Sequence, residues 1–78
     1  MATIHDRRYT RLIRHLVECR KANGVAQRDV ATALKITQST VSKVESCGRR
    51  IDVLELRDWL TAIGYSPSKF LREVGWLD

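Results

Sequence analysis

The sequence predicts an all-α fold of five short helices around one core. Apolar residues recur at three- and four-residue spacing in successive segments, which is the period of a helix with one buried face. Capping residues and glycines separate these segments. No stretch alternates apolar and polar residues for long enough to form a strand. With 78 residues, the chain is expected to form one domain over residues 1–78.

The first helix is predicted over residues 6–22. Asp6 is a suitable N-cap, and Asn23-Gly24 is a strong C-terminal stop. The helix carries one apolar stripe, with a single arginine at the same spacing. This stripe comprises Tyr9, Leu12, Ile13, Leu16, Val17 and Arg20.

Two shorter helices are predicted next, over residues 27–34 and 38–46, joined by the brief turn Lys35-Ile36-Thr37. Thr37 is a good N-cap for the second of them, and Cys47-Gly48 ends it. Each has a narrow apolar side. The inward residues are expected to be Val30, Ala31 and Leu34 on the first helix and Val41 and Val44 on the second.

The last two helices are predicted over residues 53–63 and 67–74. Asp52 is the expected N-cap of the former and Gly64 its stop, while Ser66 caps the latter and Pro67 occupies its first position. Both helices have apolar residues at helical spacing. These are Val53, Leu56, Trp59, Leu60 and Ile63, followed by Phe70, Leu71 and Val74.

The charge of the chain is unevenly placed. The formal net charge is +5, from 14 Lys+Arg and 9 Asp+Glu. Residues 1–50 hold 11 Lys/Arg and 4 Asp/Glu, a net of +7, whereas residues 51–78 hold 3 and 5, a net of −2. This asymmetry favours one surface that faces a polyanion, and the alternative is a simply solvated basic face.

Several functional classes are excluded by composition. No apolar run approaches the ~18–20 residues of a membrane span, and the N-terminus lacks the apolar core of a signal peptide. Two cysteines are too few for a disulfide framework, so reduced thiols in the cytoplasm are expected. Nothing assembles a nucleophile with its base, so we expect neither an enzyme nor a cofactor.

The pair of helices over residues 27–46 has the dimensions of a helix-turn-helix. The second helix carries short and medium donors and acceptors, which suit base edges in DNA: glutamine pairs with adenine, lysine with guanine, and serine or threonine with either. The alternative is a polar, solvent-facing helix of a small bundle.

Residues 12–64 resemble the phage-repressor/Cro-like helix-turn-helix family, also called Xre. The resemblance rests on the runs Arg20-Lys21-Ala22-Asn23-Gly24-Val25-Ala26-Gln27, Val30-Ala31 and LKITQSTVSKVES over residues 34–46, followed by a basic loop. It implies a lambda-repressor-like fold and binding to double-stranded DNA.

The resemblance also implies residue roles. Base contacts in the major groove are implied for Gln38, Ser39, Ser42 and Lys43, and backbone contacts for Gln27, Arg28, Thr37, Thr40, Arg49 and Arg50. Gln27 is further expected to brace the recognition helix. The family usually has Thr or Ser where this chain has Ala26, which cannot cap the helix and puts one phosphate contact in doubt.

Arg20 and Glu45 match a charged pair that joins the first and third helices in many relatives. We therefore expect a partly buried salt bridge between them, with a structural role.

The C-terminal segment, residues 65–78, is apolar for so late a position in so small a chain. One interpretation is that it completes the monomer core, and the other is that it forms a dimer surface. We expect both: Phe70 and Leu71 inside, with the dimer interface at Val74, Trp76 and Leu77.

His15 and Cys19 lie four residues apart and could share a helix face. Two ligands without a partner pair are a weak signal for zinc, which needs four, so no metal site is expected. Cys19 is interpreted as a small residue at the edge of the core. Cys47 could be exposed, where a redox role is conceivable.

These observations together predict a sequence-specific transcriptional regulator that binds double-stranded DNA. We expect a homodimeric repressor on a palindromic operator of phage or mobile-element type, acting in the cytoplasm at a bacterial nucleoid. The alternative is an antitoxin of a toxin–antitoxin pair, which would bind a toxin protein and also regulate its own operon.

Overall fold

Five helices make up the described part of the chain, residues 5–77, in this computed structural model. They are α1 (Arg7–Ala22), α2 (Gln27–Leu34), α3 (Gln38–Glu45), α4 (Val53–Ile63) and α5 (Pro67–Glu73). The described residues contain no strand, and the predicted all-α class is confirmed. Residues 1–4 and Asp78, which belong to the predicted domain and C-terminal segment, lie outside the described residues. The predicted helix ends at 46 and 74 fall one residue too late.

Polar side chains begin four of the helices as the sequence predicts. Asp6, Thr37, Asp52 and Ser66 each accept a hydrogen bond from a backbone N–H in the first turn of the helix that follows. Helix α2 begins at Ala26, which has no side chain to offer. The carboxylate of Asp29 instead accepts the N–H of Ala26 at 3.0 Å, so half of a capping box is kept.

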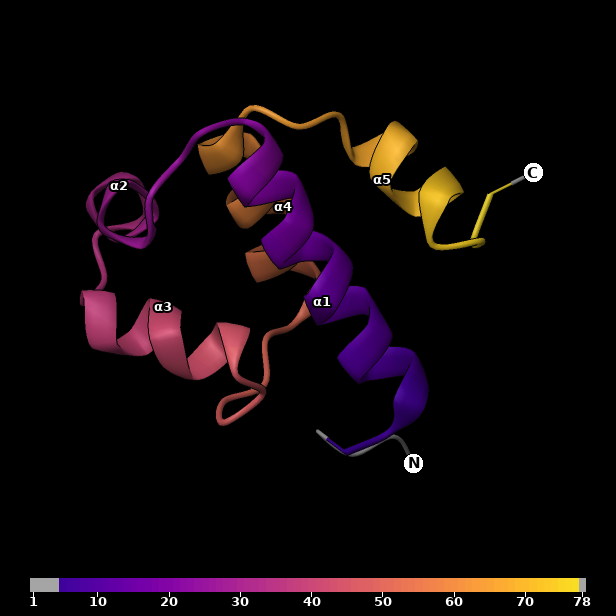
Figure 1. Ribbon diagram of the computed structural model, residues 1–78, viewed down its shortest axis with the longest axis horizontal. Helices are drawn as coiled ribbons and strands as arrows, with labels where there is room; N and C mark the ends of the chain where they lie inside the picture. The colour runs from indigo at the N-terminus through magenta and orange to yellow at the C-terminus, as the bar shows by residue number, and fades with distance from the viewer. Residues whose placement is uncertain (1–4, 78) are drawn as a thin grey trace.

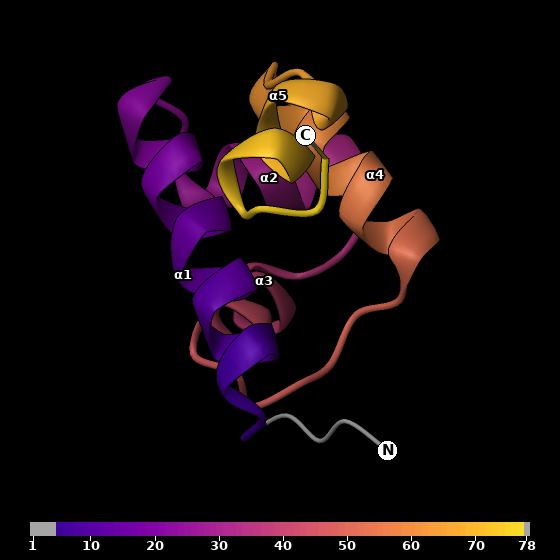
Figure 2. The same cartoon turned by 90° about the vertical axis from the view of Figure 1, so that its right-hand side faces the viewer.

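The core lies where α1 and α4 meet the helix-turn-helix on one side and α5 on the other (Figures 1 and 2). Helix α1 packs against α3 and α4, and α4 packs against α2 and α5. Trp59 and Phe70 are the largest fully buried side chains. In Figure 1, α2 and α3 occupy one end of the molecule and α5 the other.

The ends of α1 and α4 are tied together by one side chain. Nδ2 of Asn23, just after α1, donates to the carbonyl of Ile63 at 2.8 Å. It also lies 3.4 Å from the carbonyl of Gly64. The residue predicted only as a helix stop therefore also joins α1 to α4, through a partner forty residues away in the chain.

The predicted apolar face of α4 is wrong at its first residue. Val53 is 73% exposed, because it directly follows the N-cap and the buried stripe begins one turn later, at Leu56. At the C-terminal end, Phe70 is fully buried as expected, whereas Leu71 and Val74 are only half-buried. No helix in the described part of the chain is long and apolar enough to cross a membrane.

The turn between α2 and α3 depends on a left-handed residue. Lys35 has φ 57°, and its N–H donates to the carbonyl of Thr32 at 3.3 Å. The next N–H, from Ile36, reaches back to the carbonyl of Ala31 at 3.0 Å. This conformation costs a side-chain-bearing residue about 1–2 kcal/mol. The turn that orients α3 is therefore mildly strained.

Replacing Lys35 by glycine should stabilise the protein. Glycine adopts the left-handed conformation without strain, which favours the folded state, but it loses more chain entropy on folding, which opposes it. The balance is an expected gain of about 0.5–1 kcal/mol in the free energy of unfolding. Thermal unfolding measures it. Lys21→Gly, within α1, removes the same charge and should instead cost about 1 kcal/mol. A loss in both variants would contradict the strain at Lys35.

Candidate nucleic-acid interface

Helix α3 presents two different faces. Val41 and Val44 are completely buried against the core, whereas the four residues predicted to contact bases are all exposed. Those four residues are Gln38, Ser39, Ser42 and Lys43. Figure 1 shows α3 at the periphery of the molecule, with its outer side away from α1 and α4. A helix held in this way can enter a groove without unfolding any part of the core.

The start of α3 is fixed by two threonines. Oγ1 of Thr37 accepts the backbone N–H of Thr40 at 3.1 Å and lies 2.9 Å from the Thr40 hydroxyl. Thr37 is exposed and Thr40 is half-buried. The hydroxyls predicted to contact the DNA backbone thus also order the N-terminus of α3, where free N–H groups and the helix dipole favour a phosphate.

A nearly buried ion pair holds α3 from behind. Nε of Arg20 lies 2.6 Å from Oε2 of Glu45, and Nη2 lies 2.9 Å from Oε1. The two side chains are only 8% and 6% exposed. The remaining guanidinium nitrogen, Nη1, donates to the carbonyl of Val25 at 2.7 Å. The structure therefore brings the expected pair together, in a bidentate geometry and more deeply buried than expected.

Gln27 joins this network from the start of α2. Its Nε2 donates to Oε1 of Glu45 at 3.0 Å, so one carboxylate connects α1, α2 and α3. The expected bracing of α3 by Gln27 takes this form. Arg28, beside it, is exposed at the beginning of the same helix. The backbone contacts expected of these two residues stay predictions.

The basic loop after α3 is shaped by residues that the sequence analysis did not connect with it. Nη2 of Arg49 lies 3.5 Å from Oε2 of Glu55, at the exposed surface. The guanidinium of Arg50 lies 5.7 Å from the centre of the Tyr9 ring, and the Tyr9 hydroxyl accepts the N–H of Ile51 at 3.1 Å. Through these two contacts of Tyr9, helix α1 supports the loop. Burial of the Tyr9 hydroxyl also raises its pKa.

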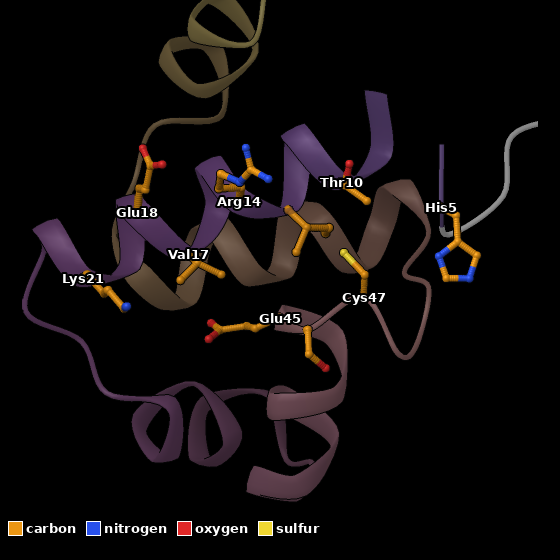
Figure 3. A pocket seen from close by; sticks show the side chains of 10 residues that line it. His5, Thr10, Arg14, Val17, Glu18, Lys21, Glu45 and Cys47 are labelled. Carbon is orange, nitrogen blue, oxygen red and sulfur yellow. The ribbon is translucent and has the colours of Figure 1, made fainter. Parts of the chain in front are cut away.

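A shallow hollow of about 550 Å³ lies between α1 and the end of α3 (Figure 3). Its walls mix Val17 and Lys21 of α1 with Cys47 after α3, and Glu45 reaches toward α1 between them. Cys47 is half-buried and adopts φ 62°, so the left-handed residue that ends α3 is the cysteine and not Gly48. Of the buried ion pair, Glu45 is the member that lines this hollow.

Comparison with known proteins agrees with this geometry. A helix-turn-helix family model matches residues 16–70. A solved structure titled "XRE-family like protein" from Pseudomonas syringae pv. tomato str. DC3000 is 41% identical, with a TM-score of 0.84. The match covers 91% of this chain and 87% of that one. The chain belongs to the Xre-type helix-turn-helix family. No match was found among the curated proteins.

Membership in the Xre family confirms the resemblance and the lambda-repressor-like fold predicted from the sequence. Proteins of this family are DNA-binding transcriptional regulators without enzymatic activity. The helix-turn-helix of this Xre-family chain is the pair α2 and α3, and both lie within the matched residues.

Removing the buried carboxylate should strongly destabilise this Xre-family domain. Glu45→Ala leaves Arg20 buried without its partner charge, so we expect a loss of about 3–5 kcal/mol in the free energy of unfolding. Arg49→Ala breaks the exposed pair with Glu55 and should cost no more than about 1 kcal/mol. Chemical denaturation of both variants measures the difference, and equal losses would contradict the structural role of the buried pair.

Proposed function

We propose that this Xre-family regulator is a sequence-specific, homodimeric repressor that places α3 in the major groove of a palindromic operator. The observation that carries the proposal is the division of α3 into a buried apolar side and an exposed polar side. The buried ion pair and the Gln27 amide hold this helix in a fixed orientation. A rigid polar helix at the surface is what direct base readout requires.

Base readout is assigned to Gln38, Ser39, Ser42 and Lys43. Glutamine can pair with both the N6 and N7 edges of adenine, and lysine with the acceptors of guanine. The serine hydroxyls can donate or accept. From Thr37 to Ser42 the helix carries no charged residue, which supports selection by hydrogen-bond pattern over attraction to phosphate.

Affinity is assigned to residues around α3 that can reach phosphates. They are Gln27, Arg28, Thr37, Thr40, Arg49 and Arg50, and they come from the starts of α2 and α3 and from the loop after α3. Their positions on both sides of the recognition helix would fix its register on the duplex. Because counterions are released from the duplex, binding should weaken steeply with salt.

The homodimer is assigned to the C-terminal segment and to Val74, Trp76 and Leu77. Trp76 is 58% and Leu77 is 43% exposed, which leaves apolar area without cover in the monomer. Exposed Val53 lines a small cavity together with Trp76, so this apolar area continues onto the start of α4. A two-fold partner here would present two α3 helices about 34 Å apart, one turn of DNA. Pairing with a toxin stays a prediction.

The base-reading role predicts a loss of specificity. Gln38→Ala and Lys43→Ala should each weaken binding to the selected operator by about 1–3 kcal/mol, and binding to random duplex much less. Arg50→Ala should weaken both duplexes by a similar factor and reduce the salt slope by about one unit. Selection from a random duplex pool, followed by binding titrations at several salt concentrations, provides both measurements.

Arg57→Ala is the matched control, because it removes an exposed charge from α4, a helix that carries no assigned DNA contact. We expect it to change binding less than Arg50→Ala. The base-reading assignment is wrong if Gln38→Ala lowers operator and random binding equally.

The dimer assignment predicts a change of oligomeric state. Trp76→Ser should shift the protein toward monomer in sedimentation measurements and weaken the full palindrome more than a half-site. Trp76→Phe keeps an apolar ring and should retain the dimer. A wild-type protein that is monomeric throughout, and that binds two half-sites independently, would contradict the proposal.

A further inference from the structure

Three side chains of different chemistry meet where α5 packs onto α1, away from the helix-turn-helix. Nε2 of His15 lies 2.9 Å from Oε1 of Glu73 and 3.5 Å from Sγ of Cys19. The three ligand atoms all lie within 4.8 Å of one another. His15 and Cys19 share one face of α1, and the fold brings Glu73 to them from fifty-eight residues away.

Imidazole nitrogen, thiolate sulfur and carboxylate oxygen are the three donor types that bind Zn²⁺ in proteins. Zinc bonds of about 2.0–2.3 Å at tetrahedral angles place ligand atoms roughly 3.2–3.8 Å apart. The pair formed by Cys19 and His15 is already at such a distance. Glu73 lies at the exposed edge of the cluster, with 35% of its side chain exposed, so it can move by the small amount that an ion requires.

His15 has a carboxylate on the side of its second ring nitrogen, beyond direct hydrogen-bond distance, and an aromatic ring beside it. Its other ring nitrogen, Nδ1, lies 3.9 Å from Oε2 of Glu18, and its ring centroid lies 5.2 Å from that of Phe70. A carboxylate behind the distal nitrogen is the usual second partner of a zinc-bound histidine, because it fixes the tautomer and the orientation of the ring. Phe70 is fully buried and provides a fixed wall.

The Glu73 carboxylate is also held by a neighbouring side chain. The Tyr65 hydroxyl donates a hydrogen bond to Oε1 of Glu73. A hydrogen-bonded ligating carboxylate is typical of metal sites.

We propose that His15, Cys19 and Glu73 form a zinc-binding site that cross-links α1 to α5. Three protein ligands leave a fourth position, which water can occupy because His15 and Glu73 are partly exposed. When the ion binds, the Cys19 thiol releases its proton to solvent and the sulfur bonds to zinc as a thiolate. His15 binds the ion through Nε2 as a neutral imidazole, so its proton moves from Nε2, where it faces Glu73, to Nδ1 on the side of Glu18. In the sequence, His15 and Cys19 have no further ligand beside them; the fold supplies Glu73.

A bound ion would stabilise the packing of α5, and with it the segment that carries Val74, Trp76 and Leu77. This stabilisation is separate from DNA recognition, because the cluster and α3 contact α1 through different side chains. Arg20 of α1 contacts α3, whereas His15 of α1 contacts α5. The zinc site can therefore fail while the proposed DNA-binding function holds.

The test uses the full chain, stripped of metal with a chelator and kept reduced. Zinc titrated against a chromophoric competitor should bind at one ion per chain and raise the temperature of thermal unfolding. Cobalt(II) in place of zinc should give a thiolate-to-cobalt charge-transfer absorption. Each of Cys19→Ser, His15→Gln and Glu73→Gln should weaken zinc binding by more than about tenfold.

The chain offers a matched control for two of the three ligands. Cys47→Ser and His5→Gln remove the other thiol and the other imidazole, and both should keep full zinc affinity and the cobalt absorption. Glu18→Gln should weaken zinc binding by about tenfold without abolishing it, as an outer-shell change does.

Folding is checked separately, because Cys19 is buried. Circular dichroism in excess chelator should show the same helix content for Cys19→Ser as for the wild type, and the unfolding temperature of Cys19→Ser should not respond to zinc. Equal zinc affinity in wild type and Cys19→Ser, a cobalt spectrum without the thiolate absorption, or loss of binding in Cys47→Ser would each overturn the proposal.

Discussion

The buried ion pair between Arg20 and Glu45 is the interaction on which the arrangement of the helix-turn-helix depends. Two charged groups taken out of water are stable only when their hydrogen bonds are satisfied. Here the guanidinium donates to both carboxylate oxygens and to the carbonyl of Val25, and the amide of Gln27 donates to the same carboxylate. The pair is directional, so it fixes the orientation of α3 where the small buried valines alone would allow it to rotate.

The charges of this domain divide its surface into regions with different uses. The basic first half contains the helix-turn-helix and the loop with Arg49 and Arg50, while the slightly acidic second half contains α4 and α5. Helices α3 and α5 occupy different ends of the molecule in Figure 1, whereas the tail after α5 returns toward the basic loop, because Trp76 lines a hollow together with Arg50. A net charge of this sign favours attraction to a polyanion such as DNA.

Most of the fold could be predicted from the sequence because it depends on local rules. Helical periodicity located all five helices, and capping residues such as Thr37 and Asp52 placed the starts of all of them except α2. The association of Arg20 with Glu45 could be anticipated only through the family resemblance, since neither periodicity nor charge shows which of several acidic residues would lie beside a given arginine.

Features that depend on tertiary packing could not be predicted. The position of Glu73 beside His15 follows from how α5 docks, which no local pattern records. The Tyr9 hydroxyl is bonded to a loop forty-two residues away, so an aromatic residue of the apolar stripe gave no sign of its polar role. Val53 fitted the apolar period of α4 but lies beyond the end of the core, because periodicity defines a face and not how far the neighbouring helices extend.

The Asn23 side chain, which joins the ends of α1 and α4, affects whether the loop between α3 and α4 can vary in length without disturbing the fold. The amide fixes α4 to α1 without using the loop between α3 and α4, and the ion pair fixes the end of α3 in the same way. The helices that the loop over residues 46–52 connects are therefore held by bonds outside it, and within the loop only Ile51 is buried and bonded to Tyr9. Because the entropy cost of a flexible loop rises by only about 0.6 kcal/mol for each doubling of its length, insertions before Ile51 would leave the helices in place. The length of the exposed basic part of the loop can then change without loss of the core.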